Sequence, residues 1–232
     1  MTSRPGRGLP GMGELRVHNF SVSLDGYGAG SGQSVEQPLG ADGELLHEWI
    51  FAPDGERTAV DDRMRAFGTD GIGATIMGRN MFGPIRGPWG DEEWTGWWGA
   101  EPPFHHDVFV LTHHARRPLE MAGGTTFHFV TEGIEAALDR ARAAAGDGHV
   151  RLGGGVATVR EYLRAGLLDE LHLAVVPVLL GSGERLFGDL GSALDGWGCV
   201  EFVASPSVAH VRLRRDAGAP QPGTEATPDL GL

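Results

Sequence analysis

The chain has 232 residues, 41% of them hydrophobic and 22% charged, with a formal net charge of −12 and one cysteine, Cys199. This composition is typical of a globular protein with one large or two small domains, and the single cysteine excludes a disulfide-stapled scaffold. Nucleic acid and anionic membrane surfaces require a basic face, so such a chain is not expected to bind either of them.

The two ends of the chain differ from its body. Residues 1–12 and 216–232 are rich in Gly, Pro and polar residues without apolar periodicity, so we expect two disordered segments around one domain at 13–215. No apolar run reaches the ~18 residues of a membrane span, and none resembles a signal peptide. These features predict a cytoplasmic protein.

Strand-like and helix-like segments alternate through most of the body. The alternating part is predicted to comprise strands at 14–24, 72–78, 107–112, 126–131 and 149–152, and helices at 56–68, 133–146 and from 156 onward. Residues 167–181 and 198–215 then look like long strands without a helix between them. The expected fold class is α/β, with a mostly parallel central sheet, flanking helices and antiparallel C-terminal strands.

Three strand ends carry residues suited to an anion. Gly153, Gly154 and Gly155 stand between a strand and a helix, and Gly78 and Arg79 follow a buried strand. The third strand end carries a set of polar and basic residues: Thr112, His113, Arg116. Ligands of open α/β sheets lie at the carboxyl ends of strands, where a helix start favours phosphate. Each junction alone is also compatible with an ordinary turn or loop, but together they suggest a dinucleotide.

Several motifs resemble those of the dihydrofolate-reductase-like superfamily, above all the reductase domain of the riboflavin-biosynthesis deaminase-reductase. These motifs are "FSVSLDGYGAG", "TIMGRNMFGP", "VLTHH" and "RLGGGVATVREYLRAGLLDELHLAVVPVLLGSGERLF", and the similarity spans about residues 15 to 213. The last motif is the most specific. "SLDG" alone is weak.

The resemblance implies that the chain uses NADPH as its hydride donor. It places Gly153–Gly155, with Val156 and Ala157, at the pyrophosphate, and Gly78 and Arg79 at the adenosine side. It places Thr112, His113 and Arg116 at the 2′-phosphate. The loop with Ser23, Asp25 and Gly26 would close over the nicotinamide and the substrate. Such domains commonly form homodimers through their C-terminal strands, which the apolar "LAVVPVLLG" segment fits.

The sequence also departs from the riboflavin enzymes. It has no H-x-E or P-C-x-x-C zinc motif, so the chain corresponds at most to the reductase half. A Trp-rich insert at 85–106 replaces a short loop, and no Lys or Arg set stands ready for a substrate phosphate. The pyrimidine substrate of those enzymes therefore stays open.

Hydride transfer also needs a proton source near the reduced bond. The candidates are Asp25, at the end of the first strand, and Glu48, whose pKa would rise if it were buried beside Trp49. Trp89, in the Trp-rich insert, and Trp49 are candidates for stacking on a flat substrate. We expect no metal site, because neighbouring residues such as His113 and His114 point to opposite faces of a strand.

These observations predict an NADPH-dependent reductase that acts on a small heterocyclic, carbonyl or imine substrate. Two alternatives stay open. The first is a non-catalytic NADPH-binding module, and the second is a true dihydrofolate or 5-amino-6-ribosylaminouracil-type reductase.

Overall fold

The computed structural model describes residues 13–53, 56–83, 87–90 and 94–216. The segments predicted to be disordered, 1–12 and 216–232, lie outside the described residues except for Asp216. Within the described ranges, no helix has the length and apolar character needed to cross a lipid bilayer.

The described helices and strands occur in this chain order: β1 (Leu15–Ser23), β2 (Tyr27–Ala29), 3-10 helix η1 (Gly43–His47), α1 (Glu48–Phe51), α2 (Ala59–Phe67), β3 (Ile72–Gly78), α3 (Arg79–Phe82), β4 (Asp107–Leu111), β5 (Leu119–Glu120), 3-10 helix η2 (Ala122–Gly124), β6 (Thr126–Val130), α4 (Ile134–Ala145), β7 (His149–Gly154), α5 (Val156–Arg164), β8 (Glu170–Val176), β9 (Glu184–Arg185), β10 (Trp197–Ala204) and β11 (Ala209–Arg215).

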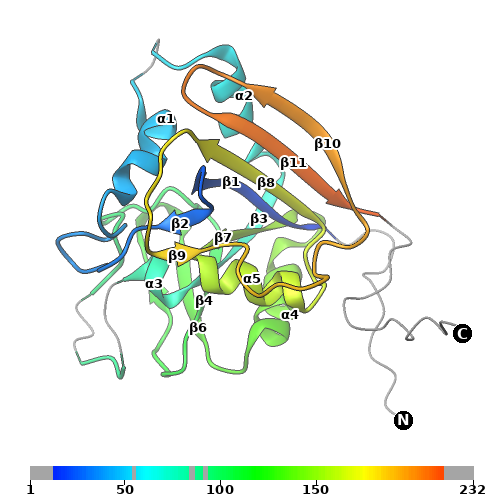
Figure 1. Ribbon diagram of the computed structural model, residues 1–232. Helices are drawn as coiled ribbons and strands as arrows, with labels where there is room; N and C mark the ends of the chain where they lie inside the picture. Colours follow the sequence, from blue (N-terminus) through cyan, green and yellow to red (C-terminus); the bar gives the residue numbers. More distant parts are fainter. Residues whose placement is uncertain (1–12, 54–55, 84–86, 91–93, 217–232) are drawn as a thin grey trace, which may run out of the picture.

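Nine of these strands form one sheet in the order β10-β11-β8-β1-β7-β3-β4-β6-β5 (Figure 1). The strands from β8 to β6 run parallel to one another, and β11, β10 and β5 join the sheet antiparallel. The short strands β2 and β9 pair separately. This arrangement confirms the predicted fold class, an α/β protein with a mostly parallel sheet and antiparallel C-terminal strands.

One face of the sheet is covered by α4 and α5 (Figure 1). Parallel strands are buried on both faces, so their sequences are nearly continuous apolar runs, and Ile76, Val150 and Leu152 are fully buried here. The predicted strand at 167–181 is shorter in the structure, because β8 ends before Pro177 and the chain turns toward β9. Residues 177–183 form an irregular connection to β9.

The other face carries a buried polar network where α2 covers β1, β8 and β11. The backbone N–H of Asn19 donates to Nδ1 of His172 (3.0 Å), whose Nε2 lies 3.1 Å from Nδ1 of His210. Nε2 of His210 in turn lies 3.0 Å from Oδ1 of Asp61. Because the first bond requires a bare Nδ1 on His172, each ring donates through Nε2, and the bonds run in one direction from β1 to α2.

A second buried group lies beside this chain of bonds. Oε1 of Glu170 accepts from the guanidinium of Arg212 at 2.8 Å and lies 3.2 Å from Nε2 of His18. Nδ1 of His18 faces the carbonyl oxygen of Phe67 at 3.2 Å, so both nitrogens of His18 face acceptors. Burial would raise the pKa of the Glu170 carboxyl, but the bonds from His18 and Arg212 lower it to about 2.

Candidate active site

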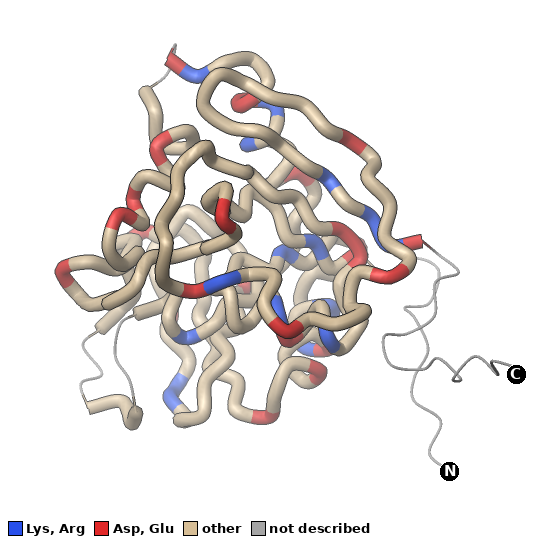
Figure 2. The backbone as a smooth tube through the Cα atoms, viewed as in Figure 1, with Lys and Arg blue, Asp and Glu red and all other residues tan. Residues whose placement is uncertain are grey.

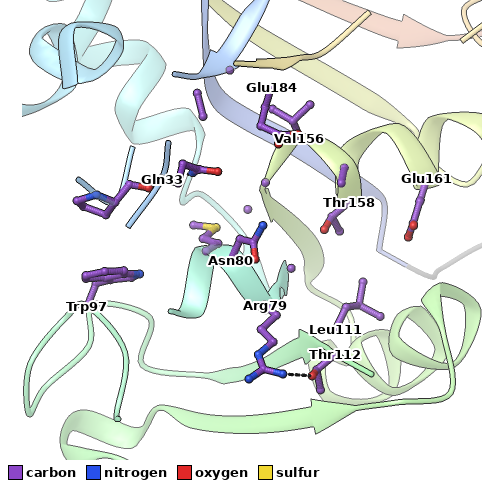
Figure 3. A pocket seen from close by; sticks show the side chains of 18 of the residues that line it. Gln33, Arg79, Asn80, Trp97, Leu111, Thr112, Val156, Thr158, Glu161 and Glu184 are labelled. Atoms are coloured by element: carbon purple, nitrogen blue, oxygen red, sulfur yellow. Dashed lines mark hydrogen bonds between the residues drawn. The ribbon is translucent and has the colours of Figure 1, made fainter. Parts of the chain in front are cut away.

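A cavity of about 720 Å³ lies at the carboxyl ends of β3, β4, β6 and β7 (Figure 3). Its opposite wall comes from β1, β2 and the segment 30–51, which includes η1 and α1 and lies against β1 and β2 through η1. Small-molecule sites in proteins are typically concavities of ~300–1,000 Å³, often at strand ends of this kind. The volume and the position of the cavity both fit a ligand site.

Besides the one-turn helix α3, which follows Gly78, two helices begin at this cavity, each with a glycine at the N-cap. Gly133 precedes α4 and Gly155 precedes α5, and neither helix has a side-chain capping bond. The first backbone N–H groups of a helix lack intrahelical partners and carry the positive end of the helix dipole. The two helix starts therefore present main-chain donors to the space between them. The sequence analysis predicted both helices but assigned only the start of α5 to the anion site.

The glycines at the strand ends differ in what a side chain at their position would meet. A Cβ on Gly78 would lie 2.3 Å from Oγ1 of Thr158, so a side chain there would separate β3 from α5. A Cβ on Gly155 would meet no atom within 4 Å, because Gly155 borders the open cavity, as Gly153 also does. Gly154 has a φ of +124° and is absent from the described lining. Val156 and Ala157 line the cavity as predicted from the resemblance.

Arg79 is held at the end of β3 by neighbouring side chains. Its guanidinium carbon lies 3.7 Å from the centre of the Trp89 ring, and one of its nitrogens lies 3.5 Å from Oγ1 of Thr112 (Figure 3). Thr112 and His113 also line the cavity. Stacking on an aromatic ring fixes the plane of the guanidinium, which suits the recognition of a phosphate.

Trp89 and Arg116 lie behind this group rather than in the described lining of the cavity. Trp89 was predicted to stack on substrate, but in the structure its ring stacks on Arg79 and meets Phe129 edge to face, and its Nε1–H donates to the carbonyl of His114 at 2.8 Å. The guanidinium of Arg116 lies 5.1 Å from the Trp89 ring centre. Trp89 therefore supports Arg79 directly, and Arg116 packs against Trp89.

The opposite end of the cavity is aromatic, and its described lining includes no Lys or Arg. Figure 3 shows Gln33 and Trp97 on this side, away from Leu111 and Thr112. His47 and Phe51, from η1 and α1, line the cavity as well. The sequence prediction missed Gln33 and His47, because they come from an irregular segment without hydrophobic periodicity. The spacing of His47 and Phe51, four residues apart, was the available signal.

The structure places Ser23, Asp25 and Gly26 outside the described lining of the cavity. The Asp25 carboxylate accepts from the Ser23 hydroxyl at 2.6 Å and from the backbone N–H groups of Leu180 and Gly181 at 3.2 and 2.8 Å. The bond from Ser23 is the main cause of a lowered pKa of Asp25. The Asp25 carboxylate therefore ties the β1–β2 turn to the connection after β8.

The second carboxyl candidate, Glu48, is exposed and lines a separate depression of about 240 Å³ together with Trp49. Trp49 is 4% exposed. Its Nε1–H donates to the Ser21 hydroxyl at 2.9 Å, and its ring meets His210 edge to face. Trp49 therefore packs between α1 and the sheet, and at this end it is His47, not Glu48, that faces the cavity.

Charge is distributed unevenly around the cavity. Among its described lining residues, Arg79 is the single Lys or Arg. The segment 28–51 carries four acidic residues and no basic one, and Figure 2 shows the acidic residues of this part of the chain. Within the described ranges, no three His, Cys, Asp or Glu side chains are grouped so that they could hold a metal ion. A cation is thus present at one end only.

Comparisons with known proteins agree with this architecture. Residues 17–209 match the family model described as the RibD C-terminal domain. No curated protein sequence matches the chain.

Three solved structures are similar in fold. One, from Shewanella sp. PV-4, is assigned to riboflavin biosynthesis (20% identity, TM-score 0.59, 88% of this chain and 99% of that one). Another is a diaminohydroxyphosphoribosylaminopyrimidine deaminase/5-amino-6-(5-phosphoribosylamino)uracil reductase from Thermotoga maritima (14%, TM-score 0.55, 88% and 57%). The third is a pyrimidine reductase-like protein from Corynebacterium diphtheriae (15%, TM-score 0.51, 88% and 93%).

The family match covers most of the chain, and the fold and the cavity at the strand ends agree with it. The chain therefore belongs to the RibD C-terminal domain family, and it is an oxidoreductase that shares its fold with the riboflavin-biosynthesis and pyrimidine reductase-like structures.

Proposed function

We propose that this protein reduces a small heterocyclic, carbonyl or imine substrate by hydride transfer from NADPH. The observation that carries the proposal is the combination of two uncapped helix starts, at Gly133 and Gly155, with the stacked guanidinium of Arg79 in one cavity. Main-chain N–H groups at helix starts bind phosphates, and arginine adds a charged donor pair.

The residues present fit a phosphorylated dinucleotide. The open space beside Gly155 leaves room for a pyrophosphate next to the first N–H groups of α5. Arg79, Thr112 and His113 then stand at the ends of β3 and β4, where they would meet a 2′-phosphate. NADPH differs from NADH by this phosphate, so the group around Arg79 would select NADPH.

The bound nicotinamide would supply the hydride. The chain's own residues would align the two reactants, exclude water and provide a proton. The aromatic end of the cavity, with Phe51 and Trp97, offers a surface for a flat substrate, and Gln33 offers an amide for polar contacts. Such an arrangement asks for no covalent intermediate with the protein.

The direct test is isothermal titration calorimetry with NADPH and NADH. We expect NADPH to bind at least about tenfold more tightly than NADH, since a charged hydrogen-bonding contact contributes roughly 1.5–3 kcal/mol. Arg79→Gln should reduce this preference severalfold. Arg140→Gln, in an exposed ion pair with Glu132, is the matched control and should leave it unchanged.

An absence of binding heat with saturating NADPH would contradict the proposed function. An unchanged NADPH preference in Arg79→Gln would instead contradict the role given to Arg79.

A further inference from the structure

The ionisable groups that line the cavity lie on elements of two kinds. Most of those described belong to strand ends and to the helices that follow them: Arg79, His113, His114, Glu161. The remaining two are Glu184, on β9, and His47, at the end of η1. His47 lines the cavity together with Phe51, Gln33 and Trp97, so it is the one histidine on the aromatic wall of the described cavity.

The imidazole of His47 has no hydrogen-bond partner among the described residues. Its nearest ring is that of Phe51, tilted by 52° with the centres 6.3 Å apart. Burial lowers the pKa of His47 below its ordinary value of 6.5, and no charged group contributes to that shift. Both ring nitrogens are therefore uncommitted, and at neutral pH the ring is mostly uncharged.

We propose that His47 is the catalytic acid of this reductase and that the substrate is a flat, unphosphorylated heterocycle with a polarised C=N or C=O bond. The inference rests on the proposed function and deepens it. The place of His47 in the cavity and its uncommitted nitrogens carry the first part. The aromatic lining of Phe51 and Trp97, without a cation beside it, carries the second.

The proposed step balances with one proton and one hydride. The substrate's C=N or C=O π bond breaks as the carbon receives the hydride and its two electrons. The nitrogen or oxygen then takes the proton from an N–H of protonated His47, which returns to the neutral imidazole and is reprotonated from water. Each turnover consumes one NADPH and one proton and releases NADP⁺ and the reduced substrate.

The distribution of charge excludes a phosphate at the substrate end. Binding a phosphate dianion requires cations or a set of main-chain donors. The described cation of the cavity, Arg79, lies with Thr112 at the end of β3 and β4, and the wall that includes His47 and Gln33 belongs to an acidic segment. A phosphorylated substrate would meet repulsion there.

The first experiment measures turnover and its pH dependence for His47→Gln. The probes are two uncharged flat heterocycles, 7,8-dihydropterin with a C=N bond and isatin with a ketone. We expect a loss of at least about tenfold in kcat with NADPH affinity unchanged within twofold, a typical contribution of general acid catalysis being 10²–10⁴-fold. The wild-type rate should rise as the pH falls below 6.5, and His47→Gln should lose that rise.

The matched control is His128→Gln. His128 pairs with Asp107 on the outer strands and does not line the described cavity, so this variant should keep the wild-type rate and pH profile. Wild-type turnover by His47→Gln would overturn the role of His47. A loss of NADPH affinity in the same variant would also overturn it, because His47 would then act on the cofactor.

A second measurement does not depend on turnover. The imidazole signal of His47, assigned by its absence in His47→Gln, is followed by NMR while 7,8-dihydropterin is added to the NADP⁺-saturated protein. We expect this signal to shift while that of His128 does not. An unmoved His47 signal would overturn the proposal. Absence of NADP⁺ binding would instead refute the reductase function itself, which separates the two failures.

The third measurement tests the class of substrate with a matched pair. Calorimetry of the NADP⁺ complex compares 5-amino-6-(5-phosphoribosylamino)uracil with its dephosphorylated form. We expect the dephosphorylated compound to bind at least about fivefold more tightly. Tighter binding of the phosphorylated compound would show that a phosphate is accommodated at this end and would overturn the substrate assignment.

Discussion

The sheet has two wings, one on either side of β1, and the two wings differ in the side chains that they bury. In the wing of β7, β3, β4 and β6 most of the buried side chains are apolar, as Ile76, Val108 and Val150 show. In the wing of β8, β11 and β10 the face toward α2 buries His172 and His210 together with Glu170. The first wing ends in the ligand cavity, and the second holds a network of hydrogen bonds.

Because of this difference, the two wings should respond differently to substitution and to pH. The first wing buries mostly apolar side chains, and at its cavity Gly155 can be changed without touching the core. A buried ionic network depends on the protonation of each member, and removing one partner of a buried pair typically costs ~3–5 kcal/mol. Changes at Gly155 should therefore alter binding, and changes in the buried network of the second wing should alter stability.

The largest expected effect is in the first wing, for Gly155→Val. A Cβ at Gly155 meets no protein atom within 4 Å and borders the cavity beside the first N–H groups of α5, so a side chain there would enter the cavity. We expect the NADPH affinity to fall at least about a hundredfold, measured by calorimetry, since the branched side chain fills the proposed pyrophosphate position. The melting temperature without ligand should change by less than about 3 °C, because no contact is lost.

Gly78, which also lines the cavity, offers the contrast. Gly78→Val places a Cβ 2.3 Å from Oγ1 of Thr158, between β3 and α5, so it should lower the melting temperature strongly as well as binding. If Gly155→Val lost as much stability as Gly78→Val, the separation of binding from stability in this wing would be refuted.

The sequence predicted the first wing well, and the reason is physical. Buried parallel strands require apolar runs, and a ligand at their ends requires small residues and cations directly after them. Both requirements concern residues that are neighbours in the chain, so short motifs such as "TIMGR" and "RLGGGVA" meet them. Gly78, Arg79, Thr112, His113 and Gly153 were found in this way, and all of them line the cavity.

The second wing and the aromatic end of the cavity could not be found by the same reasoning. The bonds of His172 connect residues far apart in the chain, from Asn19 to His210, and no short pattern encodes such a contact. The choice of Glu48 over His47 has a related cause. The two are neighbours at the junction of η1 and α1, and only the rotation of that junction decides which one faces the cavity.

A medium effect on stability is expected in the second wing at acid pH. Burial lowers the pKa of His172 to about 3, well below its ordinary value of 6.5. Between these two values the unfolded chain binds the proton more readily, so stability is complete above pH 6.5 and is lost as the pH falls. The free energy of unfolding from urea titrations should decrease by up to about 1.4 kcal/mol per pH unit. Below pH 4.5, protonation of Glu170 adds to the loss.

His172→Gln sharpens this test. A glutamine amide can accept from the N–H of Asn19 and donate to His210, but it does not titrate. The variant should therefore show a flatter dependence of stability on pH between about 6.5 and 5, where His172 dominates. A wild-type protein equally stable at pH 8 and pH 5, or a variant with the wild-type slope, would contradict the link between His172 and acid stability.

The smallest effect on stability is expected at the outer strand of the second wing. A substitution there should instead change the oligomeric state. β10 is an edge strand that exposes Val200 and Phe202 by 52% and 68%, and such edges tend to pair or to be covered. We propose that a second copy covers this edge, giving a homodimer through the C-terminal strands. Size-exclusion chromatography with light scattering should give twice the 24.7 kDa chain mass, and Phe202→Glu should reduce it to the monomer. Leu179→Glu, equally exposed but outside β10, should stay dimeric, whereas a monomeric wild-type protein would show that the second wing ends in solvent.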